Sequence, residues 1–541
     1  MAEGESARTV LITAGAYVGA ELAAEFGRMP PVFLPVGNRR LFVHQHAALV
    51  DRFDRILLSL PGDFVLADHD RDHLAALNIE VVRVPAGLDL PSSILHVIAN
   101  REVEAGHFAV LHGDTLVYGI DYEQPDTVSV AQANDAYSWA GCKITDDRVT
   151  SVFVVPESSM NEAPVLSGFF HFADLNLLVL SLAASRGDFV NAVQRYVAKR
   201  PMQASTSDRW LDFGHVHTYY ASRGRITTER AFNSLEVGNR LVAKRSTRAD
   251  RIAAEAGWYE QVPAELRIYL PHYIGRSSSD AGEAYTLEFL YMASLADLFV
   301  FARLPEPVWT RILTSCADFL KAAARHPAPP ETGLSVMELY LPKTLARLDE
   351  YARMTGVDLH RGWRINGVDT PGLLEIAERS SAWITPPEAR HLTVVHGDPC
   401  FSNILYDYRS HSVRVIDPRG QDASGHPTIW GDNRYDLAKL HHSIVGGYDL
   451  IIAGLCSAIS LAPYAVELNM PASATFDATR RAFDRVFAQS HAGDMRAVEA
   501  ISLHLFLSML PLHADSITRQ QTLLANALRL YVMITEREGA R

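Results

Sequence analysis

The first part of the chain alternates short apolar runs with stretches in which apolar residues recur at helical spacing. The apolar runs are rich in Val, Ile and Leu and precede turns that contain Gly or Pro; they lie at residues 9–12, 55–60, 80–84 and 108–111. Helical spacing is found between them, at 41–53 and 92–105. This alternation predicts βαβ units and a mostly parallel sheet, in which ligands bind beyond the carboxyl ends of the strands. Asp114 stands at one such end.

The pattern changes after residue 221. Residues 222–225, Ser-Arg-Gly-Arg, are typical of a linker. The run that begins at Phe232 predicts new strands, and the dipeptide Gly238-Asn239 is a turn signal for a hairpin between them. A β-rich segment therefore follows the first domain.

Beyond Tyr285 helical spacing dominates, interrupted by a strand–loop–strand segment at 392–417. The apolar run 287–303 contains two acidic residues, so it predicts a buried helix rather than a membrane span. We therefore expect three parts: a first α/β domain at 1–225, a small β-rich lobe at 226–290 and a larger helical lobe at 291–541.

Composition restricts the class of protein. Of 541 residues, 48% are apolar and 21% are charged, and the formal net charge is −13. Such a composition, without a run of Lys or Arg, excludes a fibrous chain and argues against nucleic-acid binding. The four cysteines form no C-x-x-C pair, which argues against a disulfide framework and is typical of a reducing compartment. We expect a cytoplasmic protein that does not insert into a membrane.

The segment 392–419 carries a constellation of oxygen-bearing side chains. Asp398 follows an apolar run, Asn403 stands farther along the same loop, and Asp417 ends the next apolar run. Phosphoryl transfer needs a carboxylate that orients the attacking hydroxyl, and hard oxygen ligands for the Mg²⁺ that bridges the phosphates. Asp398 suits the first task, and Asn403 and Asp417 suit the second. The pattern predicts that the three side chains converge on one mouth of the fold.

The order H-G-D-x-x-x-x-N followed by I-D resembles the aminoglycoside phosphotransferase/choline kinase-like family, a branch of the protein-kinase-like fold. Lys244, after L-V-A, resembles the lysine that grips the ATP phosphates, and Glu255 resembles the glutamate that pairs with it. Glu288 begins a segment that resembles the link between the lobes, where the adenine would bind. Asp436, in G-D-N-R-Y-D-L-A, resembles the aspartate that braces the catalytic loop. The glycine-rich phosphate loop of this fold is poorly developed here.

The first domain has a resemblance of its own. The segment L-P-V-G-N-R-R-L at 34–41 resembles sugar-phosphate nucleotidyltransferases, which have a GT-A-like α/β fold. Asp114 in H-G-D-T and Asp212 in W-L-D-F-G resemble the two aspartates with which that family holds Mg²⁺. The resemblance implies that a sugar-phosphate oxygen attacks the α-phosphorus of a nucleoside triphosphate at this place.

The phosphate-binding loop departs from that family's G-x-G-x-R pattern. Gly15 and Gly19 remain after the first apolar run, but Glu21 stands near where the arginine belongs, and Arg28 is the nearest cation. Two alternatives stay open. Either Arg28 replaces the missing cation, or this domain binds a nucleotide or a sugar phosphate without transferring it.

These resemblances together imply a bifunctional enzyme. The kinase part would phosphorylate a sugar or an amino alcohol with ATP and Mg²⁺, and the first domain would couple the product to a nucleoside monophosphate from a second nucleoside triphosphate. The product would be an activated precursor for a surface polysaccharide or capsule. Two alternatives remain: a kinase with a non-catalytic first domain, and a regulatory protein that binds nucleotides without turnover.

Overall fold

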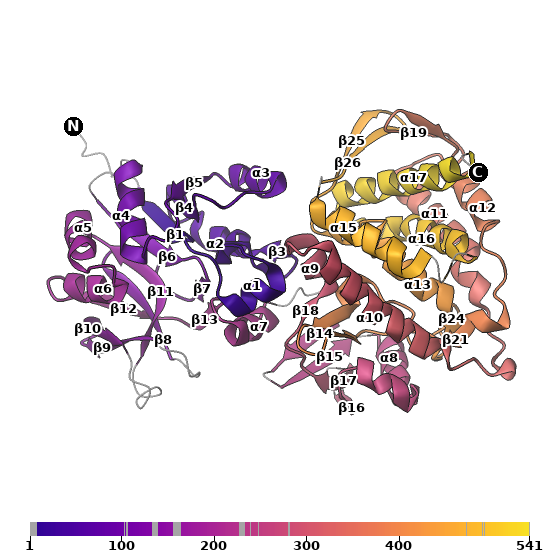
Figure 1. Ribbon diagram of the computed structural model, residues 1–541, viewed down its shortest axis with the longest axis horizontal. Coiled ribbons are helices and arrows are strands. Elements are labelled where there is room, and N and C mark those ends of the chain that lie inside the picture. Colours follow the sequence, from indigo (N-terminus) through magenta and orange to yellow (C-terminus); the bar gives the residue numbers. More distant parts are fainter. Residues whose placement is uncertain are drawn as a thin grey trace. The chain divides into compact units, whose positions relative to one another are not determined.

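The computed structural model divides the chain into two compact units, Met1–Ile226 and Thr227–Arg541. It describes residues 8–539 except 102, 104–105, 133–138, 155–163, 227–232, 239, 247, 280–281, 472, 489–490 and 492. Phe232 and Asn239, on which the predicted hairpin was based, lie outside the described residues. Figure 1 shows both units.

The strands described in the first unit include a nine-stranded mixed sheet. In sheet order they are β5 (Ile79–Val84), β4 (Arg55–Pro61), β1 (Thr9–Thr13), β6 (Phe108–His112), β11 (Val165–Phe172), β8 (Thr127–Ala131), β12 (Met202–Thr206), β10 (Arg148–Val154) and β9 (Ala140–Thr145). The first four are parallel to one another, whereas β11 runs antiparallel to β6 and to β8. The predicted α/β fold is confirmed, and the parallel part coincides with the four predicted apolar runs.

Helices and two short ribbons complete the first unit. The helices are α1 (Ala20–Phe26), α2 (Leu41–Leu49), α3 (Asp68–Ala76), α4 (Leu90–Asn100), α5 (Leu175–Ala184), α6 (Phe189–Val197) and α7 (Val216–Gly224). The ribbons are β2 (Pro35–Val36) with β3 (Arg39–Arg40), and β7 (Thr115–Tyr118) with β13 (Arg209–Asp212). The predicted linker at 222–225 is wrong for its first three residues, which belong to α7. Tyr219 and Tyr220 are buried, so their packing holds the helix through this polar stretch.

The second unit begins with the predicted β-rich lobe. Its four-stranded antiparallel sheet has the order β14 (Asn233–Val237), β15 (Leu241–Ser246), β17 (Gly282–Glu288) and β16 (Tyr273–Ser279). Helix α8 (Ala249–Gln261) follows β15 and buries Trp258 and Tyr259. Lys244 lies opposite Tyr285 on the central pair of strands, so its position is fixed by the register of β15 and β17.

The remainder of the second unit is the predicted helical lobe. Its helices are α9 (Leu295–Phe301), α10 (Glu306–Ala324), α11 (Leu341–Thr355), α12 (Leu373–Ser381), α13 (Asn433–Ile444), α14 (Tyr448–Ile452), α15 (Ala474–Phe483), α16 (Met495–Met509) and α17 (Ile517–Gly539). Its strands are β18 (Ala293–Ser294), β19 (Trp363–Ile365), β20 (Val368–Thr370), β21 (Leu392–Val394), β22 (Ile404–Asp407), β23 (Ser412–Val415), β24 (Trp430–Asp432), β25 (Ser457–Ala462) and β26 (Ala465–Asn469). The predicted two-lobed architecture of this part is confirmed.

Two apolar segments of this unit require comment. The buried helix predicted at 287–303 is wrong: β17 ends at Glu288, and α9 begins only at Leu295. The side chain of Ser294 accepts a hydrogen bond from the backbone N–H of Asp297 and so starts the helix there. The segment Met495–His513 is long and apolar enough to cross a membrane, but 78% of it is buried inside the lobe. Such burial is typical of a core helix.

Candidate functional site

Lys244 joins the two lobes of the second unit electrostatically. Its Nζ lies 2.7 Å from Glu255 Oε2 on α8 and 3.2 Å from Asp417 Oδ1 in the helical lobe. Burial lowers the pKa of Lys244, but the charges of Asp417 and Glu255 raise it more, and the pKa ends above its ordinary value. Lys244 is therefore a fixed cation, and the sequence-predicted pair with Glu255 is present in the structure.

Helix α8 is held close to the loop that follows Asp417. Tyr285 donates a hydrogen bond of 2.8 Å from its hydroxyl to Glu255 Oε2, which orients the carboxylate. Gly420 has a φ of +66°, and a Cβ at this position would lie 2.2 Å from the carbonyl oxygen of Ala254. Only glycine permits this approach, so the helix that carries Glu255 packs directly on the loop that carries Asp417.

A buried carboxylate holds the backbone of the loop that carries Asp398. Asp436 on α13 accepts hydrogen bonds from the backbone N–H groups of His396 (2.7 Å) and Gly397 (2.8 Å). Burial raises the pKa of Asp436 to about 7, although the two amide hydrogen bonds oppose the shift. The bracing contact that the sequence resemblance implied is thus present, and it fixes the backbone immediately before Asp398.

Asp398 is itself paired with a lysine. Its Oδ1 lies 2.8 Å from Nζ of Lys439, one turn beyond Asp436 on α13. Burial raises the pKa of Asp398, but Lys439 lowers it more, so the pKa ends below its ordinary value. Asp398 is therefore ionised at neutral pH, which suits a group that orients a hydroxyl by accepting its hydrogen bond.

Asn403 and Asp417 lie near the backbone of the loop that carries Asp398. The side-chain amide of Asn403 donates to the backbone oxygen of Asp398 (2.9 Å), and the N–H of Ile416 donates to the backbone oxygen of Asn403 (3.0 Å). Asp417 has a φ of 58°, an uncommon conformation for a residue with a side chain and one that concentrates at functional sites. Hydrogen bonds therefore connect the backbone segments of Asp398, Asn403 and Asp417, and the Asp417 carboxylate lies beside Lys244.

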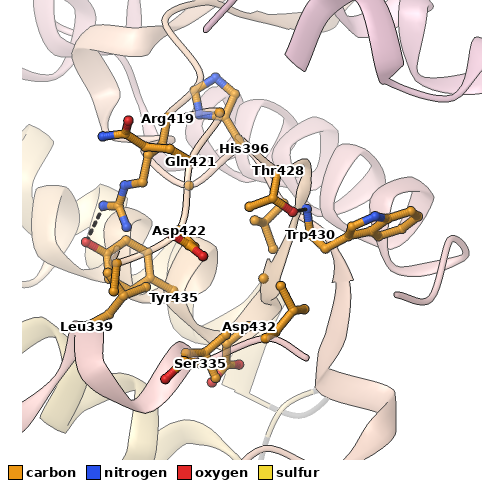
Figure 2. Close-up of a pocket in the computed structure, with 17 residues that line it drawn as sticks. Ser335, Leu339, His396, Arg419, Gln421, Asp422, Thr428, Trp430, Asp432 and Tyr435 are labelled. Atoms are coloured by element: carbon orange, nitrogen blue, oxygen red, sulfur yellow. Dashed lines mark hydrogen bonds between the residues drawn. The ribbon is translucent and has the colours of Figure 1, made fainter. Parts of the chain in front are cut away.

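Sequence reasoning missed a group of residues around Tyr435. Arg419 donates a hydrogen bond of 2.6 Å from Nη2 to the Tyr435 hydroxyl, and Figure 2 shows this contact on the wall of a pocket next to His396. Lys439 approaches the same ring from α13. Arg419 follows Asp417 by two residues, and Lys439 comes directly after the motif that contains Asp436. Their proximity to the acids was the available signal.

The first unit brings its two predicted aspartates together at the end of β6. Asp114 follows that strand, and Asp212 ends β13, which pairs with β7 so that Asp212 lies opposite Thr115. A Cβ on Gly214 would lie 2.6 Å from Asp114 Oδ2 and 3.4 Å from Asp212 Oδ1, so both carboxylates border one small space. Burial and the charge of Asp212 raise the pKa of Asp114 to about 6.

Asp212 is positioned by two neighbours on the next segment. His215 Nδ1 lies 3.1 Å from Asp212 Oδ2, and the hydroxyl of Thr218 donates to the same oxygen. Among the residues that the structure describes there is no group of three or more His, Cys, Asp or Glu that could hold a metal ion. A carboxylate pair nevertheless fits Mg²⁺, which is typically bound through one or two carboxylates together with substrate phosphates.

The remaining predicted binding residues lie in different surroundings. Gly15 is enclosed, because a Cβ there would lie 2.8 Å from Ser93 Oγ, whereas nothing lies within 4 Å of a Cβ on Gly19. Arg28 is exposed, forms an ion pair of 3.2 Å with Asp63, and stacks 3.6 Å from the centroid of Tyr17. The candidate cation of the phosphate loop is therefore engaged by a carboxylate.

Glu288 is the last residue of β17, and residues 289–292 connect the lobes. Its Oε2 accepts a hydrogen bond of 3.3 Å from the backbone N–H of His272, and its own N–H donates to the His272 carbonyl. The side chain is thus attached to the residue that directly precedes strand β16 (Tyr273–Ser279). That an adenine binds at this connection stays a prediction from the sequence resemblance.

Residues 192–449 match the family model of the phosphotransferase enzyme family. The chain contains a phosphotransferase domain. This confirms the resemblance recognised in the second half and makes the protein an enzyme of the phosphotransfer class. The predicted lysine, catalytic-loop aspartate, asparagine and second aspartate all lie within the matched residues. No curated protein matches the chain significantly.

Solved structures resemble each unit separately. A nucleoside-diphosphate-sugar pyrophosphorylase from Vibrio cholerae RC9 is 14% identical over 40% of this chain and 99% of its own, with a TM-score of 0.33. The inositol-1-phosphate CTP transferase from T. maritima is 14% identical over 42% of this chain and 98% of its own, with a TM-score of 0.32.

A thermostable mutant of the aminoglycoside phosphotransferase APH(4)-Ia, in a ternary complex with ADP and hygromycin B, is 17% identical over 57% of this chain and 92% of its own, with a TM-score of 0.37. All three identities and TM-scores are low, so we assign no residue role from these likenesses. The roles discussed below rest on the residues of this chain and on the phosphotransferase domain.

Proposed function

We propose that the protein is bifunctional. The phosphotransferase domain transfers the γ-phosphoryl group of ATP to a hydroxyl of a small metabolite, a sugar or an amino alcohol. The first unit then couples the phosphorylated product to a nucleoside monophosphate and releases pyrophosphate. The observation that carries the proposal is the position of Lys244, whose Nζ lies within 3.2 Å of a carboxylate from each lobe, Glu255 and Asp417.

In the phosphotransferase domain each residue has a separate task. Lys244, oriented by Glu255, binds the phosphate oxygens of ATP. Asn403 and Asp417 would hold Mg²⁺, which neutralises phosphate charge when it is bound. Asp398 accepts a hydrogen bond from the acceptor hydroxyl and aims its oxygen at the γ-phosphorus; the new O–P bond forms as the bond to ADP breaks, and the hydroxyl proton is released through the carboxylate to solvent. Lys439 keeps Asp398 ionised, so the carboxylate acts mainly by positioning.

In the first unit Asp114 and Asp212 are the proposed reaction centre. Two carboxylates that border one space repel each other, and a divalent cation between them removes that repulsion. Asp114 and Asp212 would hold this cation, which would supply charge neutralisation for the phosphates of a bound nucleoside triphosphate. The phosphate oxygen of the kinase product would then attack the α-phosphorus, and pyrophosphate would leave. The product, a nucleotide-activated sugar or alcohol, is of the kind used to build surface polysaccharides.

Two product assays test the two halves separately. The full chain is incubated with ATP, Mg²⁺ and a panel of sugars and amino alcohols, and ADP is measured. The same mixtures then receive CTP, GTP, UTP or dTTP, pyrophosphate is measured, and products are identified by mass spectrometry. We expect Asp398→Ala to abolish ADP formation and Asp114→Ala to abolish only the nucleotidylation of a supplied phosphorylated product.

Each other outcome has a definite meaning. Loss of ADP formation in Asp398→Ala with no pyrophosphate from any nucleotide supports a kinase whose first unit only binds. The altered phosphate loop around Glu21 and the ion pair of Arg28 with Asp63 favour this second candidate. Absence of both products with every acceptor would reject catalysis and favour a nucleotide-binding regulator.

A further inference from the structure

Three cations surround one buried tyrosine beside the proposed phosphoryl acceptor site. Arg419 donates to the Tyr435 hydroxyl, and its Cζ lies 4.5 Å from the centroid of the Tyr435 ring. Nζ of Lys439 lies 6.0 Å from the same centroid and 2.8 Å from Asp398 Oδ1. Lys343, half-buried on α11, interacts electrostatically with Tyr435, Arg419 and Lys439. Cations from three separate segments therefore meet around Tyr435, and one of them, Lys439, is paired with the Asp398 carboxylate.

The nearby acids are already engaged. Asp398 is paired with Lys439, and Asp436 accepts two backbone hydrogen bonds. Asp432 forms an ion pair of 2.7 Å with Arg434. Within the part of the chain that the structure describes, neither Lys343 nor Arg419 has a carboxylate at ion-pair distance. The charges of Asp398 and Asp436 stabilise Arg419 from a greater distance, so Lys343 and Arg419 remain without a directly paired carboxylate.

The titration of the surrounding groups agrees with a positive local potential. Burial raises the pKa of Tyr435, but the charges of Arg419, Lys343 and Lys439 lower it by more. The pKa therefore ends below its ordinary value, at about 8. Tyr435 raises the pKa of Lys343, whereas burial and the charges of Arg419 and Lys439 lower it, and the pKa ends below its ordinary value. Cations that destabilise one another in a partly buried place are stabilised by a bound anion.

We propose that the acceptor of the phosphotransferase domain is an anion, whose carboxylate or phosphate group is bound by Lys343 and Arg419 while its hydroxyl is held at Asp398. This inference rests on the proposed kinase function and narrows its substrate class to hydroxylated acids and phosphate esters. Arg419 binds such groups with its planar fork, and Lys343 binds them as a point charge. Neutral sugars and cationic amino alcohols would lack the group that these residues recognise.

The anion site can be tested without knowledge of the substrate. Full-length protein saturated with Mg²⁺ and the ATP analogue AMP-PNP is titrated with inorganic phosphate in a calorimeter, so that the nucleotide occupies its own site. We expect phosphate to bind, and Lys343→Gln to weaken it about tenfold or more, because a charge-assisted hydrogen bond is lost. Lys343→Arg should retain most of the affinity, and AMP-PNP binding should be unchanged in both variants.

Arg353→Gln provides the matched control. Arg353 lies on the same helix, α11, but is exposed and pairs with Asp349 one turn away. Its loss should leave phosphate binding unchanged. Equal phosphate affinity in wild type and Lys343→Gln, or no phosphate binding by the wild type, overturns the proposal, and so does an equal loss in Arg353→Gln.

Acceptor assays then distinguish hydroxylated acids from phosphate esters as substrates. They also distinguish a failure of the anion site from a failure of the proposed kinase activity. Glucose, glucuronate and glucose 6-phosphate, and glycerol, glycerate and glycerol 3-phosphate, are compared for ADP formation. We expect an acid or a phosphate ester to be preferred, with a KM that rises about tenfold in Lys343→Gln and a nearly unchanged kcat. Preference for a neutral acceptor with an unchanged KM overturns the anion site but leaves the kinase intact; phosphate binding without ADP formation from any compound contradicts the kinase instead.

Discussion

The two candidate reaction centres of this chain differ in whether their charged side chains are paired with opposite charges. In the phosphotransferase domain each catalytic charge has an internal partner: Lys244 lies between two carboxylates, and Asp398 is paired with Lys439. In the first unit Asp114 and Asp212 face the same space, and the pKa of Asp114 is raised to about 6. The first arrangement is preorganised, whereas the second needs a cation from solution to become electrostatically stable.

This difference has an energetic consequence. Removing one member of a buried charge pair leaves the other charge uncompensated and is costly. Removing one of two repelling carboxylates has the opposite effect on the fold. Substitutions at the two centres should therefore both abolish activity but should change stability in opposite directions.

The largest effect is expected for Asp398→Asn. The amide no longer accepts the hydroxyl's hydrogen bond as a carboxylate does, and kcat for ADP formation should fall about 10²–10⁴-fold. Steady-state ADP release with the best acceptor measures this. Asp369→Asn, which removes an exposed partner of Arg364, should keep wild-type turnover. Retention of more than a tenth of the activity in Asp398→Asn would contradict the role assigned to this carboxylate.

The next effect concerns Lys244. Lys244→Met removes the cation between Glu255 and Asp417, so kcat/KM for ATP should fall roughly 10²–10³-fold. The free energy of unfolding should also decrease, because two carboxylates then face each other without a counter-ion. Kinetics and urea unfolding measure the two effects. Lys321→Met, at an exposed position on α10, is the control; an ATP affinity equal to that of wild type in Lys244→Met would place the nucleotide elsewhere.

A smaller effect of opposite sign is expected at Asp114. Its folded-state pKa of about 6 lies above the ordinary value of 3.8, so the folded state binds more protons and stability decreases as pH rises through this window. Asp114→Asn removes the penalty and should raise the free energy of unfolding by about 1–3 kcal/mol at pH 7, with little change near pH 4.

Mg²⁺ sharpens this prediction. Millimolar Mg²⁺ should raise the Tm of the wild type at neutral pH, much less at pH 5 where Asp114 is protonated, and not at all in the first unit of Asp114→Asn. Thermal unfolding of the full chain measures the shift, and Asp121→Asn is a control outside the pair. An Mg²⁺ effect that persists in Asp114→Asn would separate the metal from this carboxylate.

The smallest effect on stability is expected for Arg28→Ala. The ion pair of Arg28 with Asp63 is exposed, so its loss should cost less than about 1 kcal/mol. If Arg28 also replaces the missing cation of the phosphate loop, pyrophosphate release should be abolished although the unfolding curve hardly moves. Unchanged pyrophosphate release would exclude that role and leave Arg28 as a surface residue.

Much of the architecture could be predicted because the apolar runs of the first unit are buried on both faces of a sheet. Residues Val10 and Val110, for example, are fully buried. The errors occurred in two segments that were interpreted from their polar or apolar composition alone. The polar stretch after Tyr220 continues a helix, and the apolar run after Leu287 contains a strand end, a connection and a helix start. In both places tertiary packing decided the backbone, and local pattern did not contain that information.

The residues of the candidate site were likewise predicted only in part. The spacing of Asp398, Asn403 and Asp417 indicated that their backbone segments lie together, as the hydrogen bonds between them show; the convergence of their side chains on one mouth stays a prediction. Lys343 was missed because nothing in the sequence places α11 near the loop of Asp398, whereas Lys439 and Arg419 were overlooked although they stand close to acids already singled out. The balance of charge in a site depends on such distant segments, so sequence motifs predicted the reacting groups and missed the groups that set their charge.

The missing side chain at Gly420 has a mechanical consequence. The backbone of the phosphotransferase loop lies against the carbonyl of Ala254, so a displacement of the helix that bears Glu255 is transmitted directly to Asp417. A single methyl group there would act as a wedge. It would push helix α8 away from the loop that carries Asp417. Glu255 and Asp417 would both remain present, but they would no longer lie close enough together to hold Lys244 between them.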